Sequence, residues 1–192
     1  MKMISADYVL TMNADKQCIQ NAAIVIDGAK IHAIGTIQQL EQQFPELKRQ
    51  HFSNQLLMPG LINSHCHSGL LRGTAEGLAV WDWLQQYIDP MHRVLTAHDA
   101  KVASYLCYAE ALLSGTTTIV DMWRYMDGSA EAAEKLGIRS ILVPYVAEHP
   151  DHNYFETLKG NNSSSKNGIK QRQGAFKCGL GLSIYFMQKK KH

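Results

Sequence analysis

A short apolar segment that ends in two closely spaced histidines constrains this chain more than any other feature. Residues Leu57–His67 read LMPGLINSHCH, so that one residue separates His65 from His67. In an extended strand alternate side chains point the same way, which places both imidazoles on one face at the carboxyl end. Neutral imidazole is a common ligand of zinc and other divalent metals. The segment therefore predicts a strand that carries a metal-binding pair, and two solvated histidines are the alternative.

From Leu57 onward the sequence alternates apolar, strand-like runs with stretches of helical periodicity. This alternation is typical of βα units, in which the strands form a parallel sheet. The sequence predicts three such strands, at Leu57–His65, Thr116–Met122 and Arg139–Val146. The β-branched residues of the second run fit a strand especially well.

Two helices are predicted between these strands. In Asp99–Leu113 apolar residues recur at helical spacing, and Gly115 follows as a helix-ending residue. Ser129–Leu136 is a shorter helix that Ser129 caps and Gly137 closes. The longer helix is expected to turn one apolar face toward the sheet, with the residues Ala100, Ala103, Leu106, Cys107, Ala111 and Leu112.

The first part of the chain, residues 1–56, has short β-like runs separated by turns. Asp27 and Gly28 lie between two of these runs, and Asp-Gly there favours a hairpin because both residues tolerate positive φ. A small antiparallel sheet is therefore predicted. Its strand-like runs are Tyr8–Met12, Ala22–Ile26 and Lys30–Gly35.

Composition and charge exclude several classes of protein. The chain has 19 basic and 17 acidic residues, and this small net charge of +2 offers no basic face for nucleic acid. No apolar run approaches the ~20 residues of a membrane span, and the first residues lack the apolar core of a signal peptide. A cytoplasmic protein with reduced thiols is predicted, because its cysteines have no paired spacing; they are Cys18, Cys66, Cys107 and Cys178.

Four further segments extend the pattern that begins at Leu57–His67. They are Leu70–Gly73 (LLRG), Trp81–Leu84 (WDWL), Ser114–Met122 (SGTTTIVDM) and Ala132–Arg139 (AAEKLGIR). Together these segments resemble the amidohydrolase superfamily, metal-dependent hydrolases built on a (β/α)8 barrel. More narrowly, they resemble the branch that contains adenosine-type and S-adenosylhomocysteine deaminases, guanine deaminase and the triazine hydrolases, including chlorohydrolases. The resemblance covers most of residues 1–158.

The resemblance implies an α/β fold, a TIM-type (β/α)8 metal-dependent hydrolase barrel preceded by part of a small β-sandwich domain. A complete barrel typically needs about 250 residues, so a chain of 192 residues is expected to hold an incomplete one. Residues 1–56 would form the N-terminal part of the β-sandwich, and residues 57–158 the first three βα units of the barrel. Open sheet edges and uncovered apolar faces predict that such a fragment folds poorly.

The last part of the chain, residues 159–192, differs in composition. It contains the polar stretch KGNNSSSKNG and ends in KKKH, which favours a disordered tail with a basic end. An alternative is that the tail is translated out of frame, because a shifted frame with permitted codons can encode a helix-like stretch and an apolar strand. The second hypothesis expects a lost nucleotide near residues 161–163, which resequencing of the gene would reveal.

The resemblance also implies a metal site at the carboxyl ends of the strands. One divalent metal, with zinc favoured over iron, would be held by His65 and His67, while Cys66 would point to the opposite side of the strand. Further ligands and the catalytic residues are expected in later strands that this chain does not contain. Asp121, at the end of the second predicted strand, is either a helix-capping or loop carboxylate or a polar partner of a ligand histidine.

Two residues that follow the metal strand are candidates for substrate contact. As a stacking residue Trp81 suits a flat purine or triazine ring, although packing within a loop is equally common for such aromatics. Arg72 suits a polar substrate group, and a surface position is its alternative. The expected reaction is hydrolytic deamination of a purine nucleoside-like or triazine heterocycle, in which metal-activated water attacks a C–N bond that is not a peptide bond.

The alternative function is a truncated, non-catalytic fragment of such an enzyme, because two imidazoles alone would hold a metal weakly. On either hypothesis the expected partners are small heterocyclic molecules, with no nucleic acid and no membrane. Members of the family are often dimers or larger assemblies, so a homo-oligomer is expected if the chain folds. Metal binding measured together with deamination separates the two hypotheses.

Overall fold

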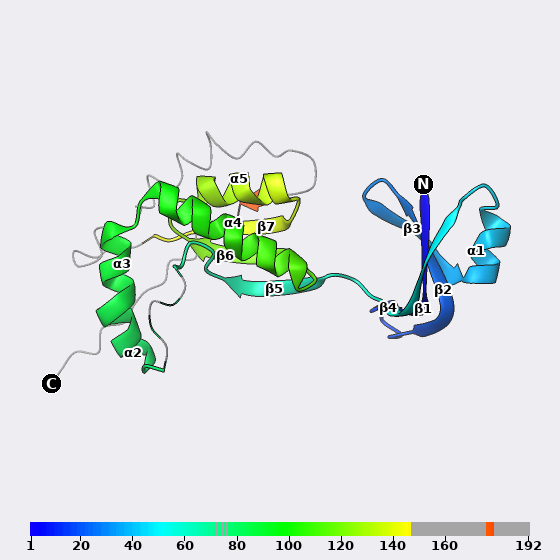
Figure 1. The fold of residues 1–192 in the computed structure, drawn as a ribbon, viewed down its shortest axis with the longest axis horizontal. Coiled ribbons are helices and arrows are strands. Elements are labelled where there is room, and N and C mark those ends of the chain that lie inside the picture. Colours follow the sequence, from blue (N-terminus) through cyan, green and yellow to red (C-terminus); the bar gives the residue numbers. More distant parts are fainter. Residues whose placement is uncertain (72, 74, 76, 147–175, 179–192) are drawn as a thin grey trace. The chain divides into compact units, whose positions relative to one another are not determined.

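The computed structural model describes residues 1–71, 73, 75, 77–146 and 176–178. These residues form two compact units, Met1–Pro59 and a second unit that begins at Gly60 (Figure 1). Each unit combines strands with helices and has its own buried apolar clusters, so the chain is a mixed α/β protein. Within the described part of the chain, the structure contains no helix with the length and apolar character needed to cross a bilayer.

A four-stranded mixed sheet forms the N-terminal unit. Its strands lie in the order β3-β2-β1-β4, and β4 runs parallel to β1 while the other neighbours are antiparallel. The expected purely antiparallel sheet is therefore corrected, because the chain returns through a helix before β4 joins the edge of β1. The elements are β1 (Lys2–Leu10), β2 (Cys18–Asp27), β3 (Lys30–Thr36), α1 (Ile37–Gln43) and β4 (Arg49–Leu57).

The predicted hairpin between β2 and β3 is confirmed. Asp27 pairs with Lys30, and Gly28 adopts φ 56°, the left-handed conformation that glycine takes at little cost in a tight turn. The first strand differs from the expected run, because it begins at Lys2 and buries Met3 in the core of the unit. The sequence therefore located the turn more accurately than the start of the sheet.

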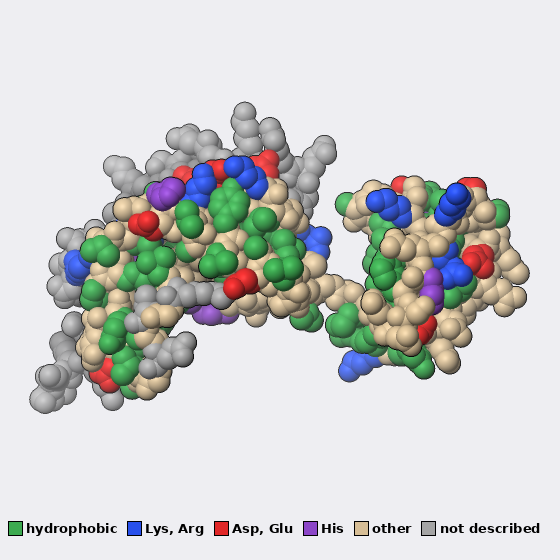
Figure 2. Space-filling view, viewed as in Figure 1, with side chains coloured by type: hydrophobic (Ala, Val, Ile, Leu, Met, Phe, Trp, Pro, Cys, Tyr) green, Lys and Arg blue, Asp and Glu red, His purple; other side chains and the backbone are tan. Residues whose placement is uncertain are grey.

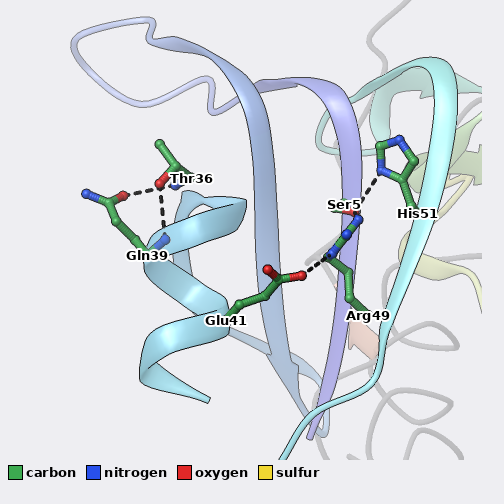
Figure 3. A network of polar contacts seen from close by, with 6 residues as sticks. All are labelled: Ser5, Thr36, Gln39, Glu41, Arg49 and His51. Carbon is green, nitrogen blue, oxygen red and sulfur yellow. Dashed lines mark hydrogen bonds and ion pairs between the residues drawn. The ribbon is translucent and has the colours of Figure 1, made fainter. Parts of the chain in front are cut away.

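Helix α1 and strand β4 were not predicted from the sequence. Thr36 starts the helix with a capping box: its hydroxyl accepts from the backbone N–H of Gln39, whose side chain accepts from the backbone N–H of Thr36 (Figure 3). Leu40 then packs into the core beside Met3. The Thr-x-x-Gln spacing was the sequence signal for this helix.

Polar contacts fasten β4 to the edge of β1 (Figure 3). Arg49 Nη1 donates to Ser5 Oγ at 3.0 Å, so the Ser5 hydroxyl donates in turn to His51 Nδ1 at 3.0 Å. The other ring nitrogen of His51 lies 3.4 Å from Asp7 Oδ1, and Arg49 Nε donates to Glu41 Oε1 at 2.8 Å. Because Ser5 is fully buried, its hydroxyl links two strands and is not an accessible nucleophile.

Parallel strands and helices form the second unit, as the alternating pattern predicted. The strand order is β5-β6-β7-β8, every neighbouring pair is parallel, and the two longest helices pack against each other and against the sheet (Figure 1). Strand β8 lies within the tail for which the sequence predicted disorder. The elements are β5 (Leu61–Cys66), α2 (Val80–Trp83), the π-helical turn η1 (Leu84–Ile88), α3 (Asp89–Val94), α4 (Ala97–Leu113), β6 (Thr116–Trp123), α5 (Met126–Leu136), β7 (Arg139–Pro144) and β8 (Phe176–Cys178).

Two strand boundaries of this unit differ from the sequence expectation. Strand β5 begins at Leu61 and not at Leu57, because Leu57 ends β4 and Pro59 has no N–H to donate to a sheet. Strand β7 ends at Pro144 and not at Val146. The histidine strand is therefore shorter than the apolar run suggested, and its last residue is the cysteine between the two histidines.

Helix α5 begins earlier than expected and ends where expected. Tyr125 precedes it in the left-handed conformation, with φ 58°, and the helix starts at Met126. Ser129 is consequently buried inside the helix and is not its cap. Gly137 closes the helix in the left-handed conformation, with φ 75°, as predicted.

Helix α4 buries most of the predicted face, since Ala100 is fully buried and Cys107, Ala111 and Leu112 pack against a buried cluster. Ala100, Ser104 and Tyr108, each four residues apart, are fully buried, whereas Leu106 is 52% exposed. Figure 2 shows hydrophobic side chains on the outer surface over this helix. Hydroxyl groups also hold the inward face, because Tyr108 donates to the buried Asp121 carboxylate and Ser104 bonds the Ser68 hydroxyl. Apolar periodicity alone does not reveal such partners.

Candidate metal centre

His65 and His67 lie together at the carboxyl end of β5. Their Nε2 atoms are 3.0 Å apart, and the two ring planes are almost perpendicular, at 84°. Two imidazole nitrogens that share one zinc ion at about 2.0–2.1 Å each lie roughly 3 to 3.4 Å from one another. The register of β5 against β6 shifts between Asn63 and Cys66, and a bulge of this kind re-aims side chains at a strand end. The pair therefore has the spacing of two ligands on one ion.

The orientation of His67 is fixed by its other ring nitrogen. Nδ1 lies 2.7 Å from the carbonyl oxygen of Met122, and because a carbonyl can only accept, Nδ1 carries the hydrogen. The Tyr145 hydroxyl oxygen lies 3.0 Å from the same nitrogen. Nε2 is thereby left with its lone pair directed toward His65, which is the tautomer that a metal ligand requires.

Electrostatics favour the neutral form of His67. Burial lowers the pKa of this imidazole below its usual value, and the neighbouring His65 acts in the same direction. The Met122 carbonyl and the Asp121 carboxylate oppose this shift without reversing it. Neutral imidazole is the form that coordinates a metal, so the surroundings of His67 prepare its Nε2 for coordination.

Asp121 supports the segment that follows His67. It lies within β6 and is fully buried, so it is neither a loop carboxylate nor a helix cap. Its Oδ1 accepts from the backbone N–H of Ser68 at 2.8 Å, and its Oδ2 accepts from the Ser68 hydroxyl and from the Tyr108 hydroxyl, the latter at 2.5 Å. Asp121 thus contacts Ser68, the residue next to His67. Met122, which follows Asp121 in the chain, contacts His67 itself.

Hydroxyl groups from two helices complete this buried network. Ser104 of α4 lies 2.8 Å from Ser68 and 2.9 Å from Ser129 of α5, measured between the Oγ atoms, and all three serines are buried. Burial raises the pKa of Asp121, while the bonds from Ser68 and Tyr108 act against that shift. Burial, followed by the nearby Asp121 carboxylate, also raises the pKa of the Tyr108 hydroxyl, which therefore remains a donor.

An aromatic cluster packs beneath His67. The ring centroids of His67 and Trp123 are 5.7 Å apart, and Trp123 contacts His92 at 4.6 Å and Tyr145 at 5.5 Å. A Cβ at Gly69 would lie 1.9 Å from Trp123 Cδ1, so only glycine allows the loop after His67 to rest on this indole. Burial, together with the charge of Arg124, lowers the pKa of His92 to about 4, and this histidine belongs to the core.

A pocket of about 630 Å³ borders the histidine pair. Its walls come from the end of β5 and from α4, and include His65, His67 and the exposed His98. Trp81 lies on α2, is 59% exposed and is not one of the residues that line this pocket. Arg72 lies outside the described residues. The structure therefore brings the two histidines together, while Trp81 is not among the residues that line their pocket.

The side chains present fit part of a metal site. Imidazole nitrogen suits zinc and iron, and both Nε2 atoms are oriented for one ion. Within the described residues there is no group of three or more histidine, cysteine, aspartate or glutamate side chains placed to hold a metal. The described part of the chain therefore supplies a pair of imidazole donors, with one of them fixed by a backbone hydrogen bond.

Several residues of the site were not identified from the sequence, namely Ser68, Ser104, Tyr108, Trp123 and Tyr145. A signal existed for two of them: Ser104 and Tyr108 are polar residues four positions apart, in line with the apolar Ala100 on the inner face of α4. Such a pair predicts a buried polar partner on the facing strand.

Comparisons with known proteins relate this chain to one family. Residues 56–181 match the model of the family described as the amidohydrolase family. The chain is 39% identical over 137 residues to a 5'-deoxyadenosine deaminase of Methanosarcina barkeri, and covers 31% of that relative with 70% of its own length. It is 36% identical over 139 residues to a 5-methylthioadenosine/S-adenosylhomocysteine deaminase of Lawsonia intracellularis, and covers 32% of it with 71% of its own length. The chain thus spans about a third of these curated relatives.

Solved structures show the same fold. An adenosine deaminase from Xanthomonas campestris with bound zinc superposes with a TM-score of 0.74 at 21% identity, over 92% of this chain and 41% of that one. The atrazine chlorohydrolase of Arthrobacter aurescens complexed with zinc gives a TM-score of 0.74 at 22% identity, over 94% of this chain and 46% of that one. Both neighbours share the arrangement of strands and helices with this chain.

Proposed function

The chain belongs to the amidohydrolase family, and on that premise we propose that it forms part of a metal-dependent hydrolase that deaminates a purine nucleoside-like molecule. Support comes from the two relatives named as deaminases of adenosine derivatives. A triazine is the second candidate substrate, because a structural neighbour is an atrazine chlorohydrolase. Both classes are flat nitrogen heterocycles with an exocyclic group that water replaces.

The observation that carries this proposal is the approach of the His65 and His67 Nε2 atoms to 3.0 Å. In the proposal these atoms hold one divalent metal, with zinc favoured because the neighbours from Xanthomonas and Arthrobacter carry it. Such a metal, when bound, supplies a nucleophile near neutral pH by lowering the pKa of water. Further ligands would come from outside the described residues.

The residues around the pair have defined tasks in this proposal. His67 is kept neutral by burial and is oriented by the Met122 carbonyl. Asp121 acts as a positioning residue, because it holds the backbone of Ser68 directly after His67. Trp81 and Arg72 remain candidates for stacking on the heterocycle and for binding a polar group of the substrate.

The proposed architecture follows from the same premise. The parallel strands β5, β6 and β7 would be the first strands of a (β/α)8 barrel, with His65 and His67 at the carboxyl end where barrel sites lie. The sheet of residues 1–56 would be part of a β-sandwich domain, and residues 57–158 would contribute the barrel units. Residues 159–192 stay a predicted tail, apart from β8.

A zinc titration of the full chain tests the proposal. The metal-stripped protein is titrated with zinc in competition with a chromophoric chelator, and His65→Ala and His67→Ala are compared with the unchanged chain. Each variant is expected to lose more than the roughly 10- to 100-fold in affinity that removal of a supporting hydrogen bond costs. His98→Ala is the matched control, because it removes another histidine from the wall of the same pocket.

The outcomes separate the proposal from the alternative. Zinc binding that depends on His65 and His67, with ammonia release from adenosine or 5'-deoxyadenosine, supports the deaminase. Zinc binding without turnover favours the non-catalytic fragment. Equal affinity in all four proteins, or no affinity in any, would overturn the metal site.

A further inference from the structure

Two thiols meet behind the histidine pair. Cys66 is the last residue of β5, and its Sγ lies 3.6 Å from the Sγ of Cys107 on α4. The two residues are 41 positions apart in the chain, so the fold and not the local sequence brings them together. Cys66 is buried and Cys107 is half-buried. The proposed deaminase mechanism uses neither thiol.

Both cysteines line the pocket of about 630 Å³ between β5 and α4. A pocket of this size admits a small oxidant to side chains that are otherwise covered by the sheet and the helix. Cys18, the cysteine of the N-terminal unit, is an exposed residue at the start of β2. The Cys66–Cys107 pair therefore has two sulfur atoms in contact and a pocket through which a small oxidant can reach them.

We propose that Cys66 and Cys107 form an oxidisable dithiol, which a hydroperoxide converts into an intrachain disulfide between β5 and α4. A disulfide bond is about 2.05 Å long, so the sulfur atoms have to approach by roughly 1.5 Å from their contact distance. Rotation of the two cysteine side chains, with a small adjustment of α4, supplies such an approach. This inference stands independently of the proposed deaminase.

The chemistry requires one molecule of hydrogen peroxide for each disulfide. The half-buried Cys107, as thiolate, attacks one peroxide oxygen; the O–O bond breaks, a sulfenic acid forms, and the departing hydroxide takes a proton to become water. The Cys66 sulfur then attacks the sulfenic sulfur, the S–O bond breaks as the S–S bond forms, and hydroxide leaves with the Cys66 proton as a second water. Two electrons pass from the two thiols to the peroxide.

The order of the two steps follows from the surroundings of each thiol. Cys66 is buried, whereas Cys107 is only half-buried, so a peroxide in the pocket meets Cys107 first. Cys66 therefore acts as the resolving cysteine. Cys107 lines the pocket on a helix face that is only partly covered.

Disulfide formation would act on the histidine pair through the backbone. Cys66 lies between His65 and His67, while Cys107 precedes Tyr108, whose hydroxyl donates to Asp121. Drawing these two positions together moves both the strand end and the helix that supports the loop after His67. This consequence rests on the proposed metal site, so it is measured separately from disulfide formation.

The test uses the full chain, reduced and then treated with stoichiometric hydrogen peroxide. Remaining thiols are blocked with iodoacetamide, the protein is digested without reduction, and peptides are identified by mass spectrometry. The expected result is a peptide pair that joins Cys66 to Cys107 and has lost two hydrogens. The pair should persist in Cys18→Ser, which removes an exposed thiol of the other unit, and should be absent from Cys107→Ser.

Two results on the unchanged chain would overturn the inference. One is full labelling of both cysteines after peroxide treatment, and the other is linkage of either cysteine to Cys18 or Cys178 in place of the Cys66–Cys107 pair. Zinc affinity is then compared between the reduced and oxidised proteins, with a fall of at least about 10-fold expected on oxidation. Zinc binding in neither state counts against the metal site alone, and the linked peptide still decides the dithiol.

Discussion

The two units contain polar networks of similar composition and different use. In the N-terminal sheet, Ser5, His51 and Asp7 lie in a row, and both nitrogens of His51 are occupied by these two neighbours. In the second unit, His67 gives only Nδ1 to a backbone carbonyl and directs Nε2 toward His65. His51 therefore links two strands through both of its nitrogens, whereas His67 keeps one nitrogen directed toward a second histidine.

Position in the sheet explains the difference. His51 lies within β4, where its ring contacts side chains of the neighbouring strand β1. His67 lies just beyond the end of β5, where the chain leaves the sheet and one face of the ring is not covered by a strand. The two carboxylates also differ in burial: Asp7 is partly exposed, whereas Asp121 is fully buried. Residue type alone consequently does not identify a site.

The largest expected effect comes from removing the buried carboxylate. Asp121→Ala leaves the Ser68 N–H and the Ser68 and Tyr108 hydroxyls without their acceptor, so the free energy of unfolding should fall by about 3 kcal/mol or more. Asp7→Ala, its counterpart in the first unit, should cost less than about 1 kcal/mol because the carboxylate is partly exposed.

Tryptophan fluorescence during urea unfolding reports selectively on the second unit, and therefore on the effect of Asp121→Ala. All three tryptophans, Trp81, Trp83 and Trp123, belong to the second unit. Hydrogen exchange of β1 and β4 amides reports on Asp7→Ala in the first unit. Comparable losses in the two variants would contradict the distinction between a buried and a surface network.

A smaller effect is expected from adding one methyl group to each unit. In Gly69→Ala the new Cβ would lie 1.9 Å from Trp123 Cδ1, and overpacking against this buried ring should cost about 1 to 3 kcal/mol. In Gly35→Ala the nearest atom is Gln39 Oε1 at 3.2 Å, the end of a flexible side chain, and the cost should be below about 1 kcal/mol. Thermal unfolding of both variants, followed by near-ultraviolet circular dichroism, checks this order; a larger loss for Gly35→Ala would refute it.

The smallest effect concerns an exposed ion pair and depends on pH. Hydrogen bonds from Lys101 and Lys135 lower the pKa of Glu131 to about 2 from its ordinary 4.5. Because the folded value is depressed, its stabilising contribution is fully present above pH 4.5 and is lost as the pH falls through about 2. Glu131→Gln should therefore flatten the acid limb of the unfolding curve slightly. Glu41→Gln, which removes the partner of Arg49, is the matching variant in the first unit. An unchanged acid limb in Glu131→Gln would contradict the stabilising role of the Glu131 contacts with Lys101 and Lys135.

The sequence predicted the elements whose signals are local. The parallel βα pattern, the Asp27-Gly28 hairpin, the Gly137 helix end and the proximity of His65 and His67 follow from periodicity and turn chemistry. Strand β4 was missed because seven of its nine residues are exposed and the other two are half-buried, so it lacks a clear period of two.

The residues that fix the site were less predictable, because they act through distant partners. Tyr108 and Ser104 define the inner face of α4 through bonds to Asp121 and Ser68, which are remote in sequence. Apolar periodicity instead favoured Leu106, which the structure exposes. The contact of His67 with the Met122 carbonyl involves the main chain, which carries no signature in the side-chain pattern.

The hydroxyl network around Asp121 has a consequence for how this protein is made. Its members, Ser68, Ser104, Tyr108, Asp121 and Ser129, all lie between β5 and β7 in the chain. All of these groups are therefore translated before the residues beyond β7. A nascent chain that has been translated as far as α5 already contains every member of the network that holds the backbone after His67.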